Sequence, residues 1–349
     1  WSFQAHRDAK NYGLSPEQCD AAFPKLWHEL DRAVAHRKKT GNITPAEMDI
    51  GWKVDGIVRA MIYDRQLYIL GTRGCRRRDY RERMLSVLQA IQRAITAYAG
   101  DLPNIEFSFT VDDGAYFAVY DNTTQATTWA LTREPTEDND NLWLMPDFGF
   151  YSWEGPAGEY TALLRAIEAD EVPFSQKDRR AVWRGAKSPA GPVPVRADLL
   201  KVSKGKEWAD IEEIRWDDAP DKGPTNLIPM SKHCKYTFPV HTEGHTYSGR
   251  LKYLLNCHSV SIIHKLHWVE NFHHLLIPSG PEQNFIQVER DFSDLHWKIS
   301  YYLEHMEEAE KVADNSIKTF RDRYLTPAAQ ACYWRKMFWA WREVSFEPE

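Results

Sequence analysis

Apolar and polar positions follow two different spacings in the first part of the chain. Helical spacing predicts one helix over residues 15–39, which begins with a Ser-Pro start signal, and a second over residues 81–98 whose apolar side chains share one face. Alternating spacing predicts strands over residues 67–70 and 105–111, and the second strand ends on an Asp-Asp-Gly turn. This part of the chain therefore mixes helices with strands.

The middle of the chain repeats an order of strand, turn and helix. A strand is predicted over residues 181–183 and a helix over residues 197–200. A tight, glycine-containing turn over residues 243–249 then leads into a helix over residues 250–256, and a β-branched strand follows over residues 260–263. This order is typical of α/β proteins that bind nucleotides.

The rest of the pattern is less regular. The charged stretch over residues 201–221 predicts a solvated surface without a site. Beyond residue 267 the spacing predicts four helices and two strands: helix 268–274, strand 275–277, strand 285–288, helix 297–302, helix 304–324 and helix 327–341. The last helix carries an aromatic face that needs a partner, and we expect that partner to be the first domain.

Length and composition bound the class of protein. A chain of 349 residues can form two domains with separate cores, and the alternation of strands and helices predicts an α/β fold. The net charge of −6 argues against nucleic acid as the main partner, and the basic run at Arg76–Arg78 is local. No run of 18 apolar residues is present to span a membrane, and because the chain starts at Trp1, we expect an upstream signal or anchor.

Three features suggest chemistry, and each has an ordinary structural alternative. The helix predicted at Arg250 would offer free backbone N–H groups and cationic side chains to a phosphate, although such cations are often solvated. Asp112 and Asp113 follow a strand end, where active sites form, but Asp-Asp-Gly is also ordinary turn chemistry. The aromatic run over residues 143–156 would line a cleft or pack in a core.

The histidines and cysteines leave other questions open. His273 and His274 point about 100° apart on a helix, so they cannot share a metal ion without further ligands. The five cysteines do not fix the compartment by themselves, while sequons at Asn42 and Asn122 are compatible with a secretory route. Abundant aromatic residues, with 14 Trp, 16 Tyr and 15 Phe, suit a sugar-binding protein as well as a well-packed core.

Six sequence segments together carry a resemblance to a known family. They are LPNIEFSFTVDD, FYSWEGP, AVWRGAKSPAGPVPVRADLL, SKHCKY, EGHTYSGRLKYLLNC and ACYW, and their order and spacing are specific. In these segments the chain resembles glycosyltransferase family 90, the capsule-associated protein family that includes the Rumi-type protein O-glucosyltransferases, and most closely its fungal branch. The resemblance covers the chain from about Leu102 to Trp341.

The resemblance implies a GT-B architecture, in which two Rossmann-like domains face each other across a cleft. It implies an acceptor-side domain with the catalytic base over residues 1–175 and a domain that binds a UDP-sugar over residues 176–326. A C-terminal helix over residues 327–349 would cross back to the first domain. The implied reaction is an inverting transfer from a UDP-sugar, either UDP-xylose or UDP-glucose, to a hydroxyl of a glycan or glycoprotein.

The resemblance also implies roles for single residues. Asp113 matches the catalytic base. The implied donor-binding residues are Arg184, Gly185, Arg196, His245, Thr246, Tyr247, Ser248, Gly249 and Arg250. The implied wall between donor sugar and acceptor is formed by Asp112, Phe150, Ser152, Trp153 and Glu154.

The paired cysteines of the family match Cys234 with Cys257, and Cys332 matches the partner of an N-terminal cysteine, which we take to be Cys19. Cys75 is left over. If these pairs form, the protein folds in an oxidising compartment, which we expect to be the lumen of the Golgi or endoplasmic reticulum, as the lumenal part of a membrane-anchored protein.

These residues suggest a mechanism without a required metal or other cofactor. We expect Asp113 to accept the proton of the acceptor hydroxyl, and Arg184, Arg196 and Arg250 to neutralise the departing UDP where other transferases use a metal. The paired acids still leave stimulation by manganese as an option. Two departures from the Rumi branch, Asp112 in place of Arg and Ala186 in place of Ser, favour an alternative: a catalytically silent protein that binds UDP-sugars or glycans.

Overall fold

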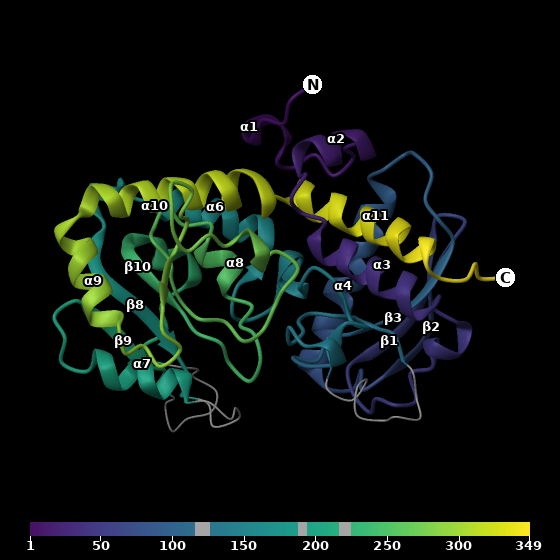
Figure 1. Ribbon diagram of the computed structural model, residues 1–349, viewed down its shortest axis with the longest axis horizontal. Helices are drawn as coiled ribbons and strands as arrows, with labels where there is room; N and C mark the ends of the chain where they lie inside the picture. The colour runs from purple at the N-terminus through teal and green to yellow at the C-terminus, as the bar shows by residue number, and fades with distance from the viewer. Residues whose placement is uncertain (116–125, 188–193, 216–224) are drawn as a thin grey trace. The chain divides into compact units, whose positions relative to one another are not determined.

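The computed structural model describes residues 1–115, 126–187, 194–215 and 225–349, so the sequon at Asn122 lies outside the described residues (Figure 1). The chain divides into two compact units, and each has its own sheet. The first unit contains Trp1–Tyr160, Trp268–Leu275 and Arg323–Glu349, and the second contains Thr161–His267 and Leu276–Asp322. The prediction of an α/β fold is confirmed, while the predicted boundaries after residues 175 and 326 remain predictions.

The first unit has helices around a mixed five-stranded sheet of order β2-β1-β3-β4-β5. Its helices include α1 (Ala5–Asp8), α2 (Pro16–Ala22), α3 (His28–Thr40), α4 (Arg78–Thr96) and α11 (Pro327–Glu343). Its strands are β1 (Ile57–Tyr63), β2 (Gln66–Arg73), β3 (Ile105–Thr110), β4 (Trp129–Ala130) and β5 (Trp143–Leu144). Strand β1 runs antiparallel to both β2 and β3, whereas β3, β4 and β5 are parallel, so this sheet is not the all-parallel sheet of a Rossmann domain.

The single helix predicted over residues 15–39 is wrong, because the structure breaks it into α2 and α3. Helix α2 ends at Ala22, and Pro24 follows. Proline has no N–H to donate and disfavours helical geometry at the residue before it, here Phe23. Helix α4, in contrast, lies close to its predicted position and buries the apolar face that the spacing indicated.

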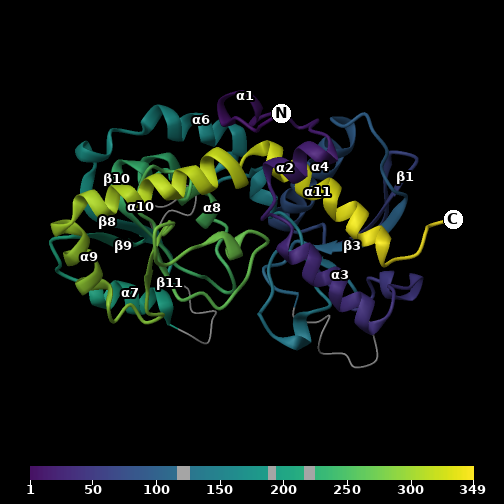
Figure 2. The ribbon, with the colours of Figure 1, turned by 45° about the horizontal axis from the view of Figure 1, so that its top comes forward.

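An aromatic cluster forms the centre of the first unit. The Trp129 ring stacks on Phe107 with 3.9 Å between centroids, and the rings of Trp334, Phe338 and Trp341 on α11 surround it. Trp339, which the sequence grouped with this face, is exposed instead. Helix α11, the last yellow helix in Figure 1, therefore packs on the sheet of the first unit and lies beside α2 and α3 (Figures 1 and 2).

The second unit has an all-parallel five-stranded sheet of order β12-β11-β10-β8-β9. Its strands are β8 (Asp178–Gly185), β9 (Ala209–Glu213), β10 (Tyr236–His241), β11 (Ile262–His264) and β12 (Ile286–Val288). Its helices include α6 (Tyr160–Asp170), α7 (Val195–Ser203), α8 (Leu251–Leu254), α9 (Leu295–Glu304) and α10 (Met306–Thr319). The apolar side chains of β8, β10, β11 and β12 form one core with α7, α9 and α10.

The strand order reverses once in this sheet. The chain passes from β8 outwards to β9, returns to β10 on the other side of β8, and continues outwards to β11 and β12. In chain order this is the doubly wound arrangement 2-1-3-4-5, and its reversal lies between β8 and β10. In sheets of this kind, ligands bind outside the carboxyl ends of the strands at the point of reversal.

Several predicted elements of the second half are wrong. Strand β9 lies inside the charged stretch that was expected to be only surface, and strand β10 was not predicted. The predicted helix 268–274 and strand 275–277 are absent apart from a short 3₁₀ turn over His273–Leu275. Instead, Val269 and Arg133 each donate a backbone N–H to the carbonyl of the other. A helix over residues 268–274 would need these groups of Val269 for its own hydrogen bonds.

The helix predicted over residues 250–256 is also shorter, because α8 covers only Leu251–Leu254. After α8 the backbone hydrogen bonds join residues three positions apart, and the Cys257 N–H donates to the Leu254 carbonyl. Cys257 is tied to Cys234 by a disulfide, and this bond fixes where the chain must go after α8. The predicted helix 304–324 likewise divides, since α10 is followed by one π-helical turn over Phe320–Tyr324.

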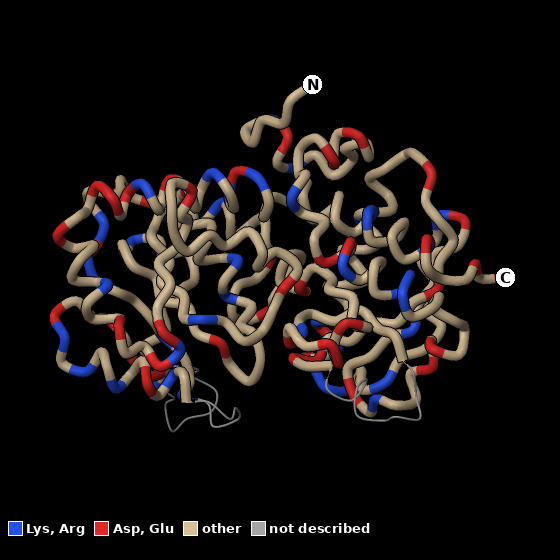
Figure 3. The backbone as a smooth tube through the Cα atoms, viewed as in Figure 1, with Lys and Arg blue, Asp and Glu red and all other residues tan. Residues whose placement is uncertain are grey.

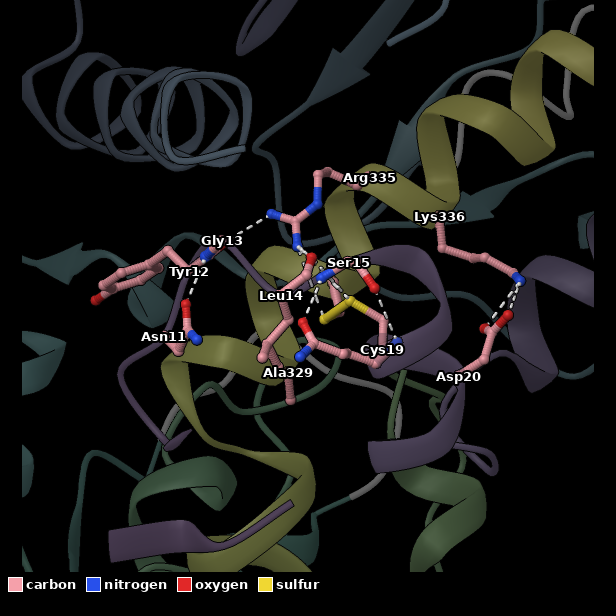
Figure 4. The surroundings of a disulfide bond; sticks show 12 residues. Asn11, Tyr12, Gly13, Leu14, Ser15, Cys19, Asp20, Ala329, Arg335 and Lys336 are labelled. Carbon is pink, nitrogen blue, oxygen red and sulfur yellow. Dashed lines mark hydrogen bonds and ion pairs between the residues drawn. A yellow bond between two sulfur atoms is a disulfide. The ribbon is translucent and has the colours of Figure 1, made fainter. Parts of the chain in front are cut away.

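The second disulfide joins Cys19 to Cys332 across 313 residues, so the structure forms both bonds that the resemblance implied. Around this bond, the Arg335 guanidinium donates to the carbonyls of Tyr12 and Leu14 at 2.6 and 2.8 Å (Figure 4). Burial lowers the pKa of Arg335 to about 10. Cys75 is a free thiol. The N-terminal segment is thus fixed to α11 by one covalent bond and one buried cation.

Charges of both signs are interspersed along the chain rather than gathered by sign (Figure 3). None of the helices formed by the described residues has the length and apolarity needed to cross a membrane.

We predict that removing the bond between Cys19 and Cys332 destabilises the first unit. Because the bond closes a loop of 313 residues, its loss should lower the free energy of unfolding by about 2–5 kcal/mol in Cys19→Ser/Cys332→Ser. Thermal unfolding followed by tryptophan fluorescence measures this effect. Cys75→Ser is the matched control and should melt like the wild type, and equal melting temperatures for all three proteins would contradict the prediction.

Candidate functional site

The carboxyl ends of β8 and β10 lie side by side where the strand order of the second unit reverses. Strand β8 ends with Arg184 and Gly185, and Thr242 directly follows β10. The indole N–H of Trp183 donates to the Thr242 hydroxyl at 3.0 Å and links the two strand ends. The predicted donor-binding segments therefore begin at the point where doubly wound sheets bind ligands.

Two glycines let side chains approach this point closely. A Cβ atom on Gly185 would lie 2.4 Å from the Trp183 ring, and a Cβ atom on Gly244 would lie 2.9 Å from the Arg196 guanidinium. Both distances are too short for a side chain without movement of the neighbour. Gly185 is one of the predicted donor-binding residues, and its role in the structure is to admit Trp183.

Arg196, in the first turn of α7, points its guanidinium at this strand end. Its Nε donates to the Glu243 carbonyl at 3.0 Å, and Nη1 donates to the Ala186 carbonyl at 3.0 Å. Burial lowers the pKa of Arg196. Because Ala186 contributes its backbone carbonyl, the absence of a serine hydroxyl at this position leaves the contact with Arg196 intact.

Arg250, which precedes α8, lies close to the same point. Its Nη1 donates to the Arg184 carbonyl, and its guanidinium lies 5.7 Å from the centre of the Trp183 ring. Burial, followed by the charge of Arg196, lowers the pKa of Arg250 to about 9. Within the part of the chain that the structure describes, no carboxylate forms an ion pair with either Arg196 or Arg250.

The third predicted arginine has a different environment. The buried Arg184 guanidinium contacts Asp210 on β9 through Nη2 at 2.5 Å, and its Nη1 donates to the Asp210 carbonyl at 2.7 Å. A third bond runs from Nε to the Asn226 carbonyl at 3.2 Å. This side chain thus fastens β8 to β9, and its expected contact with a UDP phosphate remains a prediction.

The predicted loop after β10 combines exposed and buried side chains. His245 is exposed, whereas Thr246, Tyr247, Ser248 and Gly249 are buried. The loop folds back on itself through a hydrogen bond from Gly244 N–H to the Thr246 carbonyl at 3.0 Å. Since α8 has only four residues, the expected contribution of a helix dipole is small, and the two arginines are the main positive groups here.

Two further residues at this site had no role in the sequence analysis. Glu243 is buried, accepts from Arg290 at 2.5 Å and from His267 N–H at 2.9 Å, and holds the loop that orients Arg196. His233 is buried, and this burial, followed by the charges of Arg250 and Arg184, lowers its pKa to about 4. The SKHCKY segment contains His233, but only the fold shows that this ring is neutral beside the arginines.

In the first unit, Asp112 and Asp113 form the turn that follows β3. The carboxylate of Asp112 accepts from the Lys53 ammonium at 2.7 Å, from the Tyr80 hydroxyl at 2.9 Å and from Asp113 N–H at 2.9 Å. Burial opposes ionisation of Asp112, but these bonds outweigh it and keep its pKa below the ordinary value. Burial and the bond to Asp112 raise the pKa of Tyr80.

Asp113 has a more exposed carboxylate than its neighbour, with 42% of the side chain accessible against 29% for Asp112. Its Oδ1 accepts from Arg83 Nη1 on α4 at 2.7 Å. A carboxylate that is ionised and open to solvent can accept a proton from an approaching hydroxyl, whereas one held by three donors is poorly placed to do so. Of the two acids, the geometry therefore favours Asp113 as a base.

The predicted aromatic wall is partly core. Phe150 is buried and packs edge-on against Tyr160 and Phe272. Ser152 and Trp153 form β6 (Ser152–Trp153), which pairs with β7 (Gly158–Glu159), and both side chains are half-buried. Glu154 is exposed and pairs with Arg78 at 3.2 Å. Ser152, Trp153 and Glu154 thus remain accessible to a ligand, while Phe150 belongs to the core.

Acidic, histidine and cysteine side chains are the groups that would bind a metal ion. The described ranges contain no group of three or more such residues placed to hold a metal ion. The position beside Asp112 that a cation would take is filled by the Lys53 ammonium. The expectation about manganese remains untested.

Each unit brings its own predicted residues together. Arg184, Gly185, Arg196 and Arg250 gather around the strand ends of the second unit, while Asp112 and Asp113 lie beside α4 in the first unit. Sequence reasoning missed Lys53, Tyr80 and Arg83, which contact the two acids. Tyr80 and Arg83 lie on α4 and Lys53 lies before β1, and only the folded chain shows that they face the turn.

The chain is similar to several curated proteins. It is 31% identical over 195 residues to protein O-glucosyltransferase 2 of Danio rerio, covering 54% of this chain and 37% of that protein. It is 27% identical over 193 residues to protein O-glucosyltransferase 3 of Homo sapiens, covering 53% of this chain and 36% of that protein. It is 27% identical over 125 residues to protein O-glucosyltransferase 3 of Rattus norvegicus, covering 35% and 24%.

The chain thus spans about a third of the length of the curated relatives it matches. The sequence pattern of the family described as Glycosyl transferase family 90 matches residues 15–345, which is nearly the whole chain and includes every residue of both candidate sites. This chain belongs to glycosyl transferase family 90.

Proposed function

We propose that the protein is an inverting glycosyltransferase that moves a sugar from a UDP-sugar to a hydroxyl of a glycan or glycoprotein. The observation that carries the proposal is the pair of arginines, Arg196 and Arg250, at the reversal of the parallel sheet. Both guanidinium groups are bonded to backbone carbonyls, and burial lowers the pKa of each. A diphosphate bound there would provide the two guanidinium groups with an anionic partner.

Asp113 would act as the general base. In the proposed reaction the acceptor oxygen attacks the anomeric carbon, the bond from that carbon to the UDP oxygen breaks, and the hydroxyl proton passes to Asp113. Arg196 and Arg250 would stabilise the charge that develops on the departing UDP. Because fixed cations can provide this stabilisation, we propose that the reaction requires neither a metal ion nor another cofactor, with manganese at most stimulating it.

The larger arrangement is part of the same proposal. We infer a GT-B architecture in which the second unit binds the donor and the first unit provides the base and binds the acceptor through Trp153 and Glu154. The all-parallel sheet of the second unit supports the assignment of the donor, since doubly wound sheets of this order bind nucleotides at the reversal. The predicted domain boundaries belong to this proposal.

The relatives guide the choice of donor and compartment. Those matched here are named protein O-glucosyltransferases, which supports glucose as the transferred sugar, and xylose remains the second candidate. Two disulfides support folding in an oxidising compartment, so we propose the secretory lumen, with any membrane anchor supplied by chain outside this sequence.

A catalytically silent protein that binds UDP-sugars is the alternative. The residues that first favoured it are Ala186 and Asp112. The missing hydroxyl at Ala186 stays in favour of this alternative, whereas Asp112 is bonded to Lys53 and Tyr80 beside an accessible Asp113. The accessible Asp113 supports the enzyme, and release of UDP from a donor separates the two.

We predict that the wild type releases UDP from UDP-glucose or UDP-xylose and that Asp113→Asn does not. Losing a general base should lower turnover about 10²- to 10⁴-fold, while UDP binding, measured by calorimetry, should stay at the wild-type value. UDP binding without release from any donor, tested with glycan and glycoprotein acceptors, would support the silent alternative. No binding of any UDP-sugar would sink the proposed function.

We predict that Arg250→Gln and Arg196→Gln each weaken UDP binding about 10- to 100-fold, because each removes a charged hydrogen-bond donor to phosphate. Arg179→Gln is the matched control, since Arg179 is an exposed arginine near the start of β8. It should bind UDP like the wild type. A normal melting temperature together with unchanged UDP affinity and turnover in Arg250→Gln would remove Arg250 from the site.

We predict that UDP binding weakens as the pH rises through about 9. The pKa of Arg250 in the free protein is about 9, so its cation is fully present well below that pH and is lost above it. At pH 10 the affinity should be roughly tenfold lower than at pH 8. Arg250→Gln provides the correction for titration of the nucleotide itself, and identical pH dependence in both proteins would contradict the prediction.

A further inference from the structure

We infer that Arg83 is a positioning residue that fixes the carboxylate of Asp113 against the aromatic segment of the first unit. The inference rests on the proposed function, because it assigns Asp113 the role of the base. Arg83 lies on α4, 30 positions before Asp113, and neither the composition nor the motifs of the chain single it out. Only 18% of its side chain is exposed, although it carries a charge.

The guanidinium of Arg83 makes contacts on more than one side. Nη1 donates to Asp113 Oδ1 at 2.7 Å and to the Val111 carbonyl at 3.1 Å, so the same nitrogen binds the end of β3 and the acid that follows it. The planar group also lies 4.8 Å from the centre of the Phe148 ring. A guanidinium can bond in its plane and stack on its face at once, which an ammonium cannot do.

Phe148 connects Arg83 to the residues proposed to meet the acceptor. The Phe148 ring packs edge-on against Trp153 with 5.7 Å between centroids. One turn further along α4, the Ser86 hydroxyl donates to the Ser152 carbonyl at 3.0 Å. Helix α4 therefore contacts both Asp113 and the segment with Ser152 and Trp153. Arg83 itself bonds to Asp113 and packs on Phe148, which contacts Trp153.

Charged and titratable groups from several elements lie around the turn of Asp112 and Asp113. Arg83 and Tyr80 approach from α4, and Lys53 comes from the segment before β1. Lys53 and Tyr80 both bond to the carboxylate of Asp112 and thereby anchor the backbone of the turn. Arg83 bonds to the carboxylate of Asp113 itself, so it orients that carboxylate.

This division predicts distinct effects for the donors around the two acids. Loss of Arg83 removes a charged donor that orients the Asp113 carboxylate, while the donor site in the second unit keeps all its residues. Turnover should therefore fall without a change in UDP binding.

The experiment compares wild type with Arg83→Gln, Arg83→Lys and the matched control Arg81→Gln, an exposed arginine two positions earlier on the same helix. In Arg83→Gln we expect kcat to fall about 10- to 100-fold while UDP affinity stays within twofold. Arg83→Lys should restore only part of kcat, because it keeps the charge and loses the planar fork. Arg81→Gln should match the wild type.

A second measurement does not depend on turnover. In protein with ¹³C-labelled Asp carboxyls, Asp113→Asn identifies the Asp113 resonance, and loss of the bond from Arg83 should shift this resonance in Arg83→Gln but not in Arg81→Gln. An unshifted resonance would overturn the inference whether or not the protein transfers sugar. Equal losses of UDP binding and turnover in Arg83→Gln would also overturn it, because they indicate general damage to the fold.

Discussion

Two arginines, Arg196 and Arg250, carry positive charge at the reversal of a parallel sheet with backbone carbonyls as their partners. Such a pair is costly, because each cation loses hydration and repels the other. Neighbouring residues hold the pair in place. The Trp183 indole links β8 to β10, and Gly185 and Gly244 leave room for the large side chains. Glu243 holds the loop that orients Arg196. Arg184, at the same strand end, differs from these two arginines because it forms an ion pair with Asp210. Among the described residues, no carboxylate forms an ion pair with these two cations, and such a site is suited to an anion with two phosphates.

The sequence predicted the parts of the site that follow from local order. The glycine turn before Arg250, the strand before Arg184 and the Asp-Asp-Gly turn after β3 lie where their patterns indicated, because each depends on neighbours in the sequence. The α/β class and the amphipathic helix α4 were predictable for the same reason. The assignment of function needed more than pattern, since it came from the resemblance and then from the match of the family to residues 15–345.

What the sequence could not give depends on contacts between distant residues. Strand β9 looked like charged surface because it lies at the edge of the sheet, where polar side chains are tolerated, and its Asp210 is needed by Arg184. Helix α8 stops early because Cys257 must reach Cys234, and residues 268–275 remain irregular because Val269 pairs with Arg133. The partners of Asp112 and Asp113 come from 59 and 30 positions earlier in the chain, a separation at which no periodic pattern is informative.

The two units use the guanidinium group in opposite ways, and both uses follow from the same electrostatics. In the second unit, the partners of Arg196 and Arg250 are neutral carbonyls, which orient the groups while leaving their charge for a ligand. In the first unit, Arg83 is paired with an acid, so its charge acts on the protein's own carboxylate. The proposed transfer, which releases a diphosphate and takes up a proton, needs one arrangement of each kind: cations that can meet the leaving group, and an oriented carboxylate for the base. Among the described residues, the contacts of Arg83, Arg196 and Arg250 fit both parts of that proposal with one side-chain type.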